Sequence, residues 1–217
     1  MDTTVTTGML VISRHTESEW NVLGKWTGLT DIDLTEKGHE EAHKIGQLLK
    51  GIHFNAAYTS EQKRTHQTLA GIMKGSEHDS SVPHIKSAHV NERDYGDLTG
   101  KNKWEVQREI GDEAFHGIRR GWDYPVPGGE TLKDVHGRVV PFFDAELLPR
   151  LQKGENILLV AHGNSIRALM KHLEDIHEDE IANVEMGFGE VLFYHITPTG
   201  TLHKKVTRKI DVVPPHA

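Results

Sequence analysis

Short apolar runs rich in β-branched residues alternate along this chain with longer segments that have the period of an α-helix. This alternation is typical of an α/β domain, because parallel strands need long crossover connections and helices usually supply them. The chain can therefore bury its apolar runs as strands of one largely parallel sheet. The pattern predicts strands at residues 9–12, 55–58, 82–85, 157–161, 191–196 and 202–206.

Amphipathic segments fill the gaps between the predicted strands. The clearest follows Thr35, a favourable N-cap residue, and carries Ala42, Ile45 and Leu49 on one face. Another segment contains Pro141, where we expect a kink. The predicted helices span residues 36–50, 63–73, 132–148, 164–173 and 178–183.

The interval at residues 87–130 differs from the rest of the chain. It is rich in charged residues, glycine and aromatic residues, and it shows few periodic signals. A chain of 217 residues can build one sizeable core and is short for two. We therefore expect one domain over residues 1–217, with 87–130 as an active-site excursion from the sheet.

Charge balance and cysteine content exclude several classes of function. A net charge of -7 argues against a general nucleic-acid or membrane-surface binder, since both partners favour a basic face. The chain has no cysteine, and therefore no disulfide, thiolate metal ligand or cysteine nucleophile. The first residues lack the pattern of a signal peptide and no apolar run is long enough to span a membrane, so we expect a cytoplasmic protein.

The stretch HEEAH at residues 39–43 matches the HExxH pattern of zinc hydrolases, in which two histidines bind the metal and a glutamate activates water. Its context is poor for that role. By helix phase the two histidines lie about 120° from the apolar stripe, and lysines flank them. We interpret them as part of a solvated face, and a zinc hydrolase as a weak alternative.

The stretch DIDLT at residues 31–35 resembles the aspartate nucleophile motif of aspartyl-phosphate phosphatases. That nucleophile must stand at the end of a buried strand, whereas the preceding residues here, KWTGLT, are largely polar. The stretch is better interpreted as a turn whose aspartate and threonine cap the following helix.

A third pattern places histidines and arginines at the ends of predicted strands. Arg14 and His15 follow the first strand, and His162 follows the strand ILLVA. Arg64 lies in the first turn of the helix after a third strand. Carboxyl ends of parallel strands meet at one edge of the sheet, so these four side chains are expected to converge.

Two imidazoles and two guanidinium groups form a suitable site for a phosphoryl group. A neutral imidazole nitrogen can attack phosphorus, and arginines with helix N-terminal amides can stabilise the oxygens without a metal. The second ring nitrogen of the nucleophile should donate to a backbone carbonyl, which selects the tautomer. We predict His15 as the nucleophile, because it follows its strand directly, and His162 as a stabiliser of transition-state charge.

These motifs, in this order, resemble those of the histidine phosphatase superfamily, and more narrowly its phosphoglycerate mutases that depend on 2,3-bisphosphoglycerate. The resemblance spans nearly all of residues 8–196. It implies a three-layer α/β/α sandwich around a mostly parallel six-stranded sheet. The segments that carry it are RHTESEWN, WTGLTDIDLTEKG, YTSEQKRTHQT, NERDYGDLTGKNK, RRGWDYPVPGGETL, RVVPFF and LLVAHGNSIRAL.

The resemblance also implies roles for individual residues. His15 would carry the phosphoryl group, with Arg14, Arg64 and His162 around it, and Glu92 would exchange a proton with the substrate hydroxyl. Further matching positions would bind oxygens of the substrate or the bisphosphate: Ser18, Asn21, Thr27, Gly28, Arg93, Tyr95, Lys103, Arg119, Arg120, Gly163 and Asn164.

The implied activity is the interconversion of 3-phosphoglycerate and 2-phosphoglycerate in glycolysis and gluconeogenesis, primed by 2,3-bisphosphoglycerate and requiring no metal. A histidine phosphatase acting on small phosphoesters is the alternative, because both reactions pass through phosphohistidine. Lys103, Arg119 and Arg120 favour the mutase, which must hold the far end of a bisphosphate. A pseudoenzyme that docks phosphorylated partners through the same arginines would not need His15, Glu92 and His162 together. The resemblance allows a homodimer.

The chain departs from the family pattern at several positions. Thr16 stands where glycine is usual, and its side chain must find room near the phosphate. Lys101 replaces leucine and Trp26 replaces phenylalanine. Glu190 lies in FGEV, where the family has TGVP, and would oppose anions if it lay near the pocket. The connection between Tyr124 and the next glycine pair lacks about two dozen residues of the longer members, and the C-terminal tail is short.

Overall fold

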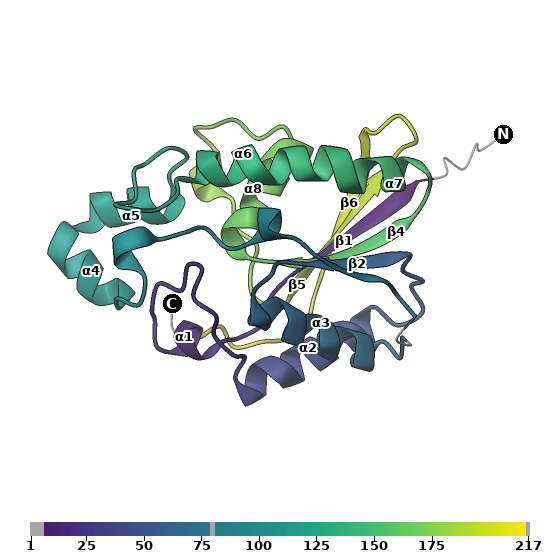
Figure 1. Ribbon diagram of the computed structural model, residues 1–217, viewed down its shortest axis with the longest axis horizontal. Coiled ribbons are helices and arrows are strands. Elements are labelled where there is room, and N and C mark those ends of the chain that lie inside the picture. The colour runs from purple at the N-terminus through teal and green to yellow at the C-terminus, as the bar shows by residue number, and fades with distance from the viewer. Residues whose placement is uncertain (1–6, 79–80, 216–217) are drawn as a thin grey trace.

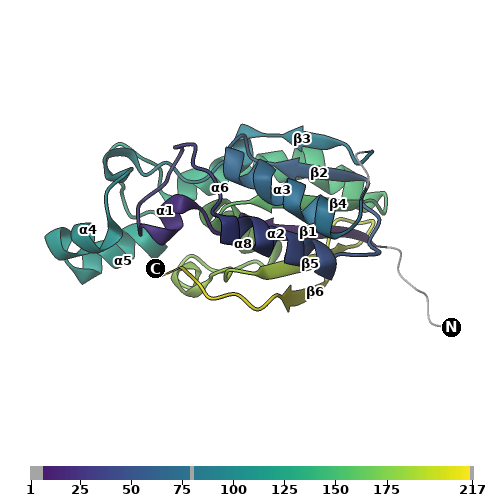
Figure 2. The ribbon, with the colours of Figure 1, turned by 90° about the horizontal axis from the view of Figure 1, so that it is seen from below.

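A computed structural model describes residues 7–78 and 81–215, which fold around one six-stranded sheet. Figure 2 shows the strands in the spatial order β3-β2-β4-β1-β5-β6. The strands are β1 (Gly8–Arg14), β2 (Ala56–Thr59), β3 (His84–Lys86), β4 (Asn156–Ala161), β5 (Glu190–Ile196) and β6 (Leu202–Lys209).

The sheet is mostly parallel, as predicted. β4 pairs in parallel with β1 and β2, and β2 pairs in parallel with β3. β5 runs antiparallel to β1, and β6 antiparallel to β5. The carboxyl ends of β1, β2 and β4 therefore lie together at one edge. β6 continues three residues beyond its predicted end, because pairing with β5 extends through Lys209.

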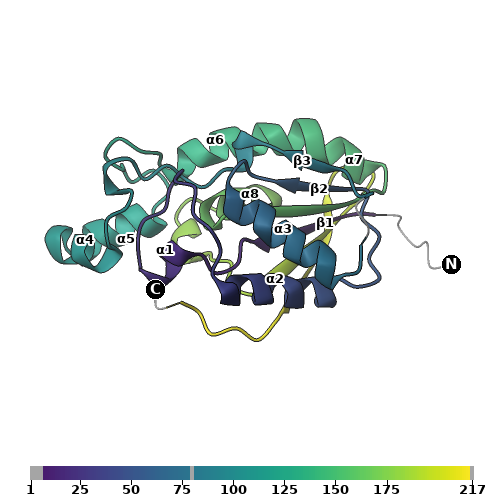
Figure 3. The ribbon, with the colours of Figure 1, turned by 60° about the horizontal axis from the view of Figure 1, so that its bottom comes forward.

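Helices cover both faces of the sheet and complete the three predicted layers (Figure 1). α2 (Glu36–Leu48) and α3 (Lys63–Gly75) lie side by side on one face (Figure 3). α6 (Leu132–Phe142), α7 (Leu148–Gln152) and α8 (Gly163–Leu173) cover the other. Successive residues of a strand face opposite layers, so Leu10 packs in the core under α6 and α8, whereas Val11 packs under α2 and α3. The three-layer α/β/α fold is confirmed.

The helix that contains Pro141 is longer than predicted. It runs from α6 through a π-helical turn, Phe143–Leu147, into α7, and thus ends at Gln152 rather than at residue 148. Proline has no N–H to donate within the helix, and the π-helical turn begins two residues after it. The irregularity predicted at Pro141 is therefore a change of helix type.

The interval 87–130 contains two helices that the sequence pattern did not predict. α4 (Lys103–Ile110) and α5 (Asp112–Arg120) project from one end of the sheet (Figure 1). They enclose a small core of their own, to which Trp26, Val106 and Phe115 contribute. Each helix is only two to three turns long, so its period was too short to recognise.

Two other local predictions need correction. The helix predicted at residues 178–183 is only a 3-10 turn, Ile181–Asn183, because the chain before it forms turns instead of helix. A short helix, α1 (Glu19–Val22), follows the first strand and had no periodic signal. None of the helices in residues 7–78 and 81–215 has the length and apolar character needed to cross a membrane.

The two competing motifs occupy the positions expected of structural elements. His39 is exposed and His43 partly exposed on the outer face of α2, and the described residues contain no cluster of three metal-ligating side chains. In DIDLT, Thr35 Oγ1 accepts the Gly38 N–H and caps α2. Asp31 accepts the N–H of Lys63, so this carboxylate caps α3 instead of the following helix.

Candidate active site

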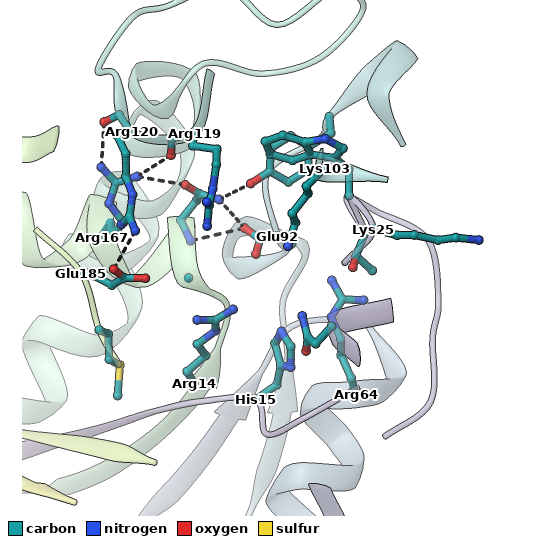
Figure 4. A pocket seen from close by; sticks show the side chains of 17 residues that line it. Arg14, His15, Lys25, Arg64, Glu92, Lys103, Arg119, Arg120, Arg167 and Glu185 are labelled. Carbon is teal, nitrogen blue, oxygen red and sulfur yellow. Dashed lines mark hydrogen bonds and ion pairs between the residues drawn. The ribbon is translucent and has the colours of Figure 1, made fainter. Parts of the chain in front are cut away.

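A pocket opens at the carboxyl ends of β1, β2 and β4, where the predicted residues converge (Figure 4). Its floor comes from the strand ends, and its far wall from α4, α5 and the loop before β5. The lining residues are Arg14, His15, Asn21, Lys25, Trp26, Thr27, Arg64, Glu92, Tyr95, Lys103, Arg119, Arg120, Gly163, Asn164, Arg167, Glu185 and Met186.

His15 is buried at the pocket floor, directly after β1. Its Nδ1 lies 2.8 Å from the carbonyl oxygen of Thr16. A carbonyl only accepts hydrogen bonds, so Nδ1 carries the proton and Nε2 has the free lone pair. Burial, with Arg64 and Arg14 nearby, holds the pKa of His15 well below its ordinary value. The predicted contact between the His15 ring and a backbone carbonyl is present, and the lowered pKa favours the neutral ring.

Arg14 and Arg64 bring positive charge to this floor without a carboxylate partner among the described ion pairs. Arg64 donates to the carbonyls of Thr30 and Gly28 at 2.9 and 3.0 Å, and burial lowers its pKa to about 10. The Arg14 guanidinium lies 4.1 Å from the ring centroid of Phe188. Cations that are largely desolvated and have no direct ion pair are costly, so this end of the pocket favours an anion.

His162 lies behind the pocket wall instead of lining it. Its ring centroid is 5.1 Å from that of His15, and Nε2 lies 2.8 Å from Ser60 Oγ. Nδ1 has no hydrogen-bond partner among the described residues. Burial, Arg64 and His15 hold the pKa of His162 well below its ordinary value, so it is a neutral ring beside His15.

Glu92 faces the same space from the loop after β3. Its Oε1 accepts the Arg93 N–H at 2.8 Å and the Asn164 side-chain amide at 3.1 Å. Arg138, the arginine of RVVPFF, holds this loop by donating to three of its carbonyls, including that of Glu92 at 3.1 Å. Its ion pair with Glu130 fixes the guanidinium. Two residues distant in sequence therefore position Glu92: Asn164 contacts its carboxylate, and Arg138 holds its backbone.

Lys103, Arg119 and Arg120 form the far wall of the pocket, opposite His15 (Figure 4). Lys103 is the first residue of α4, and the two arginines end α5. The unpredicted helices thus place the predicted cations. Burial, with Arg119 and Arg14 nearby, lowers the pKa of Lys103 to about 8. The pocket has cationic groups at both ends.

Most predicted site residues line this pocket, but four lie behind its wall: Ser18, Gly28, Arg93 and His162. The Ser18 hydroxyl donates to Asn21 at 2.8 Å, and the Gly28 carbonyl accepts from Arg64. Arg93 is fully buried and donates to the Ile118 carbonyl at 2.7 Å, so it supports α5. These residues hold their neighbours in place.

Sequence reasoning missed five lining residues as ligand contacts: Lys25, Trp26, Arg167, Glu185 and Met186. Arg167 donates to the carbonyls of Ile181, Val184 and Arg120, which ties α5 to the loop before β5. Its position on the buried face of α8, one turn after Asn164, was the available signal.

The structure shows where three of the residues that depart from the family pattern lie. The side chain of Thr16 lies against Thr68 of α3, with 3.3 Å between the hydroxyl oxygens, and does not line the pocket. Glu190 accepts the Gly187 N–H at 2.8 Å and is also absent from the lining, whereas Glu185 supplies a carboxylate there. Lys101 is exposed and outside the lining.

Comparisons with known proteins agree with this geometry. A 2,3-bisphosphoglycerate-dependent phosphoglycerate mutase from Allorhizobium ampelinum is 40% identical over 201 residues, covering 92% of this chain and 95% of the relative. A protein of the same name from Mesorhizobium japonicum is 41% identical over 198 residues, covering 90% and 96%. Among solved structures, Bacillus stearothermophilus YhfR is similar with a TM-score of 0.77 at 27% identity, over 90% of this chain and 94% of that one.

The family description that matches this chain is the histidine phosphatase superfamily (branch 1), over residues 10–207. The match includes β1, β2 and β4, whose carboxyl ends carry the two histidines and the Arg64 helix. Because the match covers nearly the whole chain and includes the residues that line the pocket, this chain belongs to the histidine phosphatase superfamily.

Proposed function

We propose that this protein interconverts 3-phosphoglycerate and 2-phosphoglycerate through a phosphohistidine at His15. The observation that carries the proposal is the contact between His15 Nδ1 and the Thr16 carbonyl, which leaves Nε2 unprotonated in a pocket with cations at both ends. The relatives that bear the mutase name support it. Such a reaction belongs to glycolysis and gluconeogenesis, and we infer a cytoplasmic location.

The residues around the pocket floor can perform phosphoryl transfer. Nε2 of His15 forms a bond to phosphorus as the ester bond to oxygen breaks, and Arg14 and Arg64 stabilise the oxygens of the transferred group. Glu92 gives a proton to the departing hydroxyl oxygen, and takes one from the attacking hydroxyl in the reverse direction. His162 is neutral before the reaction and stabilises the charge that develops on the phosphoryl group in the transition state.

The far wall fits the second anionic part of the ligand. Lys103, Arg119 and Arg120 would hold the carboxylate of a phosphoglycerate and the second phosphate of 2,3-bisphosphoglycerate. This bisphosphate supplies the phosphoryl group that loads His15. Glu92 lies between the two cationic regions. A substrate hydroxyl held between those regions can therefore reach the Glu92 carboxylate.

A histidine phosphatase acting on small phosphoesters is the second candidate, because Glu185 offsets part of the positive charge at the far wall. The two functions differ in their products. With 3-phosphoglycerate and catalytic 2,3-bisphosphoglycerate, we expect 2-phosphoglycerate, measured by NMR or a coupled enolase assay. Release of inorganic phosphate alone would contradict the mutase and support the phosphatase.

Metal removal should leave the activity unchanged. The proposed transfer uses imidazole, guanidinium and carboxylate groups, so EDTA treatment followed by gel filtration should preserve the rate of 2-phosphoglycerate formation. The measurement compares rates before and after treatment, and after addition of zinc or magnesium. Loss of activity that a metal restores would contradict this mechanism.

The activity should decline in mild alkali because Lys103 loses its charge. Its pKa is about 8 in the free protein, so kcat/KM for 3-phosphoglycerate should fall as the pH rises through that value. A single such ionisation makes kcat/KM about tenfold lower at pH 9 than at pH 7. Lys103→Arg provides the matched control, because guanidinium stays protonated over this range. The same decline in wild type and Lys103→Arg would show that another group is responsible.

A further inference from the structure

A carboxylate lies within the cationic wall of the pocket where anionic groups of the ligand are expected. Glu185 comes from the loop between the 3-10 turn Ile181–Asn183 and β5. Its Oε2 accepts from Arg120 Nη2 at 2.6 Å, with the Glu185 side chain 52% exposed. Figure 4 shows it beside Arg120 and Arg167, on the side of the pocket away from Lys25.

The negative charge of Glu185 also acts on cations other than Arg120, its ion-pair partner. Burial lowers the pKa of Arg14, Arg119 and Arg167, and the Glu185 carboxylate offsets part of that lowering in each. Glu92, the other carboxylate among the described lining residues, belongs to the proposed proton transfer. Glu185 therefore reduces the positive potential of the far wall without a part in that transfer.

The protein holds Glu185 in this place through its backbone. Arg167 donates to the Val184 carbonyl at 2.9 Å and to the Ile181 carbonyl at 2.8 Å. The same guanidinium donates to the Arg120 carbonyl at 2.8 Å. Because one buried arginine ties this loop to the end of α5, the carboxylate can turn but stays near the far wall.

We propose that Glu185 is a specificity-determining residue, which weakens binding of a second phosphate at the Arg119–Arg120 wall relative to binding of a single carboxylate there. This inference rests on the proposed function. A phosphate dianion must share Arg120 with Glu185 or displace it, and repulsion grows with the charge of the ligand. 2,3-Bisphosphoglycerate should therefore bind less tightly than the cations alone would allow, so half-maximal activation should require a higher bisphosphate concentration.

The test compares two ligands in a protein that cannot be phosphorylated. Calorimetry would measure binding of 3-phosphoglycerate and 2,3-bisphosphoglycerate to His15→Asn and to the double variant that also carries Glu185→Gln. Glutamine keeps an oxygen that can accept from Arg120 but removes the charge. Because Glu185 is partly exposed and screened, we expect affinity to rise about tenfold for the bisphosphate and about threefold or less for 3-phosphoglycerate.

Glu155→Gln in the same background is the matched control. Glu155 pairs with Arg150 at 2.6 Å, at the opposite end of β4, so its removal changes the net charge equally without affecting the pocket. The control should bind both ligands as the His15→Asn protein does. An equal gain for the bisphosphate in Glu155→Gln would assign the effect to net charge and overturn the role of Glu185.

Other outcomes are equally decisive. Equal changes for the two ligands, no change, or weaker binding of the bisphosphate in Glu185→Gln would overturn the inference while leaving the mutase assignment intact. Failure of His15→Asn to bind either ligand would contradict the proposed function itself. In the enzyme with His15 intact, Glu185→Gln should reach half-maximal activation at a lower bisphosphate concentration.

Discussion

His15→Asn is expected to lower the rate of 2-phosphoglycerate formation by about four orders of magnitude or more, the scale at which removal of a covalent nucleophile acts. Asparagine resembles the size of the ring but offers no nitrogen lone pair toward phosphorus. The acid-labile phosphoenzyme formed with radiolabelled 2,3-bisphosphoglycerate should disappear with the activity. Label retained after alkaline, but not acidic, denaturation would be the measure of the phosphohistidine.

His39→Asn is the matched control for this prediction, because His39 is exposed on α2 and does not line the pocket. It should keep both the label and the activity. An equal loss in the two variants, with both proteins folded by circular dichroism, would count against His15 as the phosphoryl acceptor. Loss of the label in His39→Asn alone would move the nucleophile to α2.

Glu92→Gln is expected to give the second largest effect. Glutamine can still accept the hydrogen bonds from Arg93 and Asn164, but it cannot exchange a proton with a hydroxyl. Loss of a general acid and base costs about 10² to 10⁴ in rate, so kcat should fall by about a thousandfold. KM for 3-phosphoglycerate should change little, because the cations at both ends remain.

The choice of phosphoryl donor separates proton transfer from a structural role of Glu92. p-Nitrophenyl phosphate has a leaving group that departs without a proton. Glu92→Gln should therefore label His15 from this donor at close to the wild-type rate, while labelling from 2,3-bisphosphoglycerate is slow. If both donors labelled His15 equally slowly, Glu92 would position the pocket instead of moving a proton.

Local patterns were sufficient to predict most of the sheet. The runs that became β1, β2 and β4 are short and mostly apolar, and a helix signal follows each of them. Their parallel pairing therefore followed from the crossover rule. The same reasoning placed Arg14, His15, Arg64 and His162 at one edge. The elements that it missed, such as α4 and α5, are short and pack against Trp26, which comes from a distant segment.

The far wall of the pocket illustrates why a pattern along the chain was insufficient there. Sequence reasoning identified Lys103, Arg119 and Arg120 only through a resemblance, because nothing near them in the chain indicates that they face His15. It named Glu190 as the carboxylate to consider, but the loop before β5 directs Glu190 to the Gly187 N–H. Glu185 instead meets Arg120, which is 65 residues away.

Strand positions, helix caps and the chemistry of the phosphoryl site depend on neighbouring residues, and the order of residues along the chain was enough to infer them. The direction in which a side chain points within a pocket depends on packing between distant segments. The Thr16 side chain lies against Thr68 of α3, and Glu185 against Arg120 of α5, because the fold brings these distant segments together. Contacts of this kind join residues that are far apart in the chain, so no local stretch encodes them.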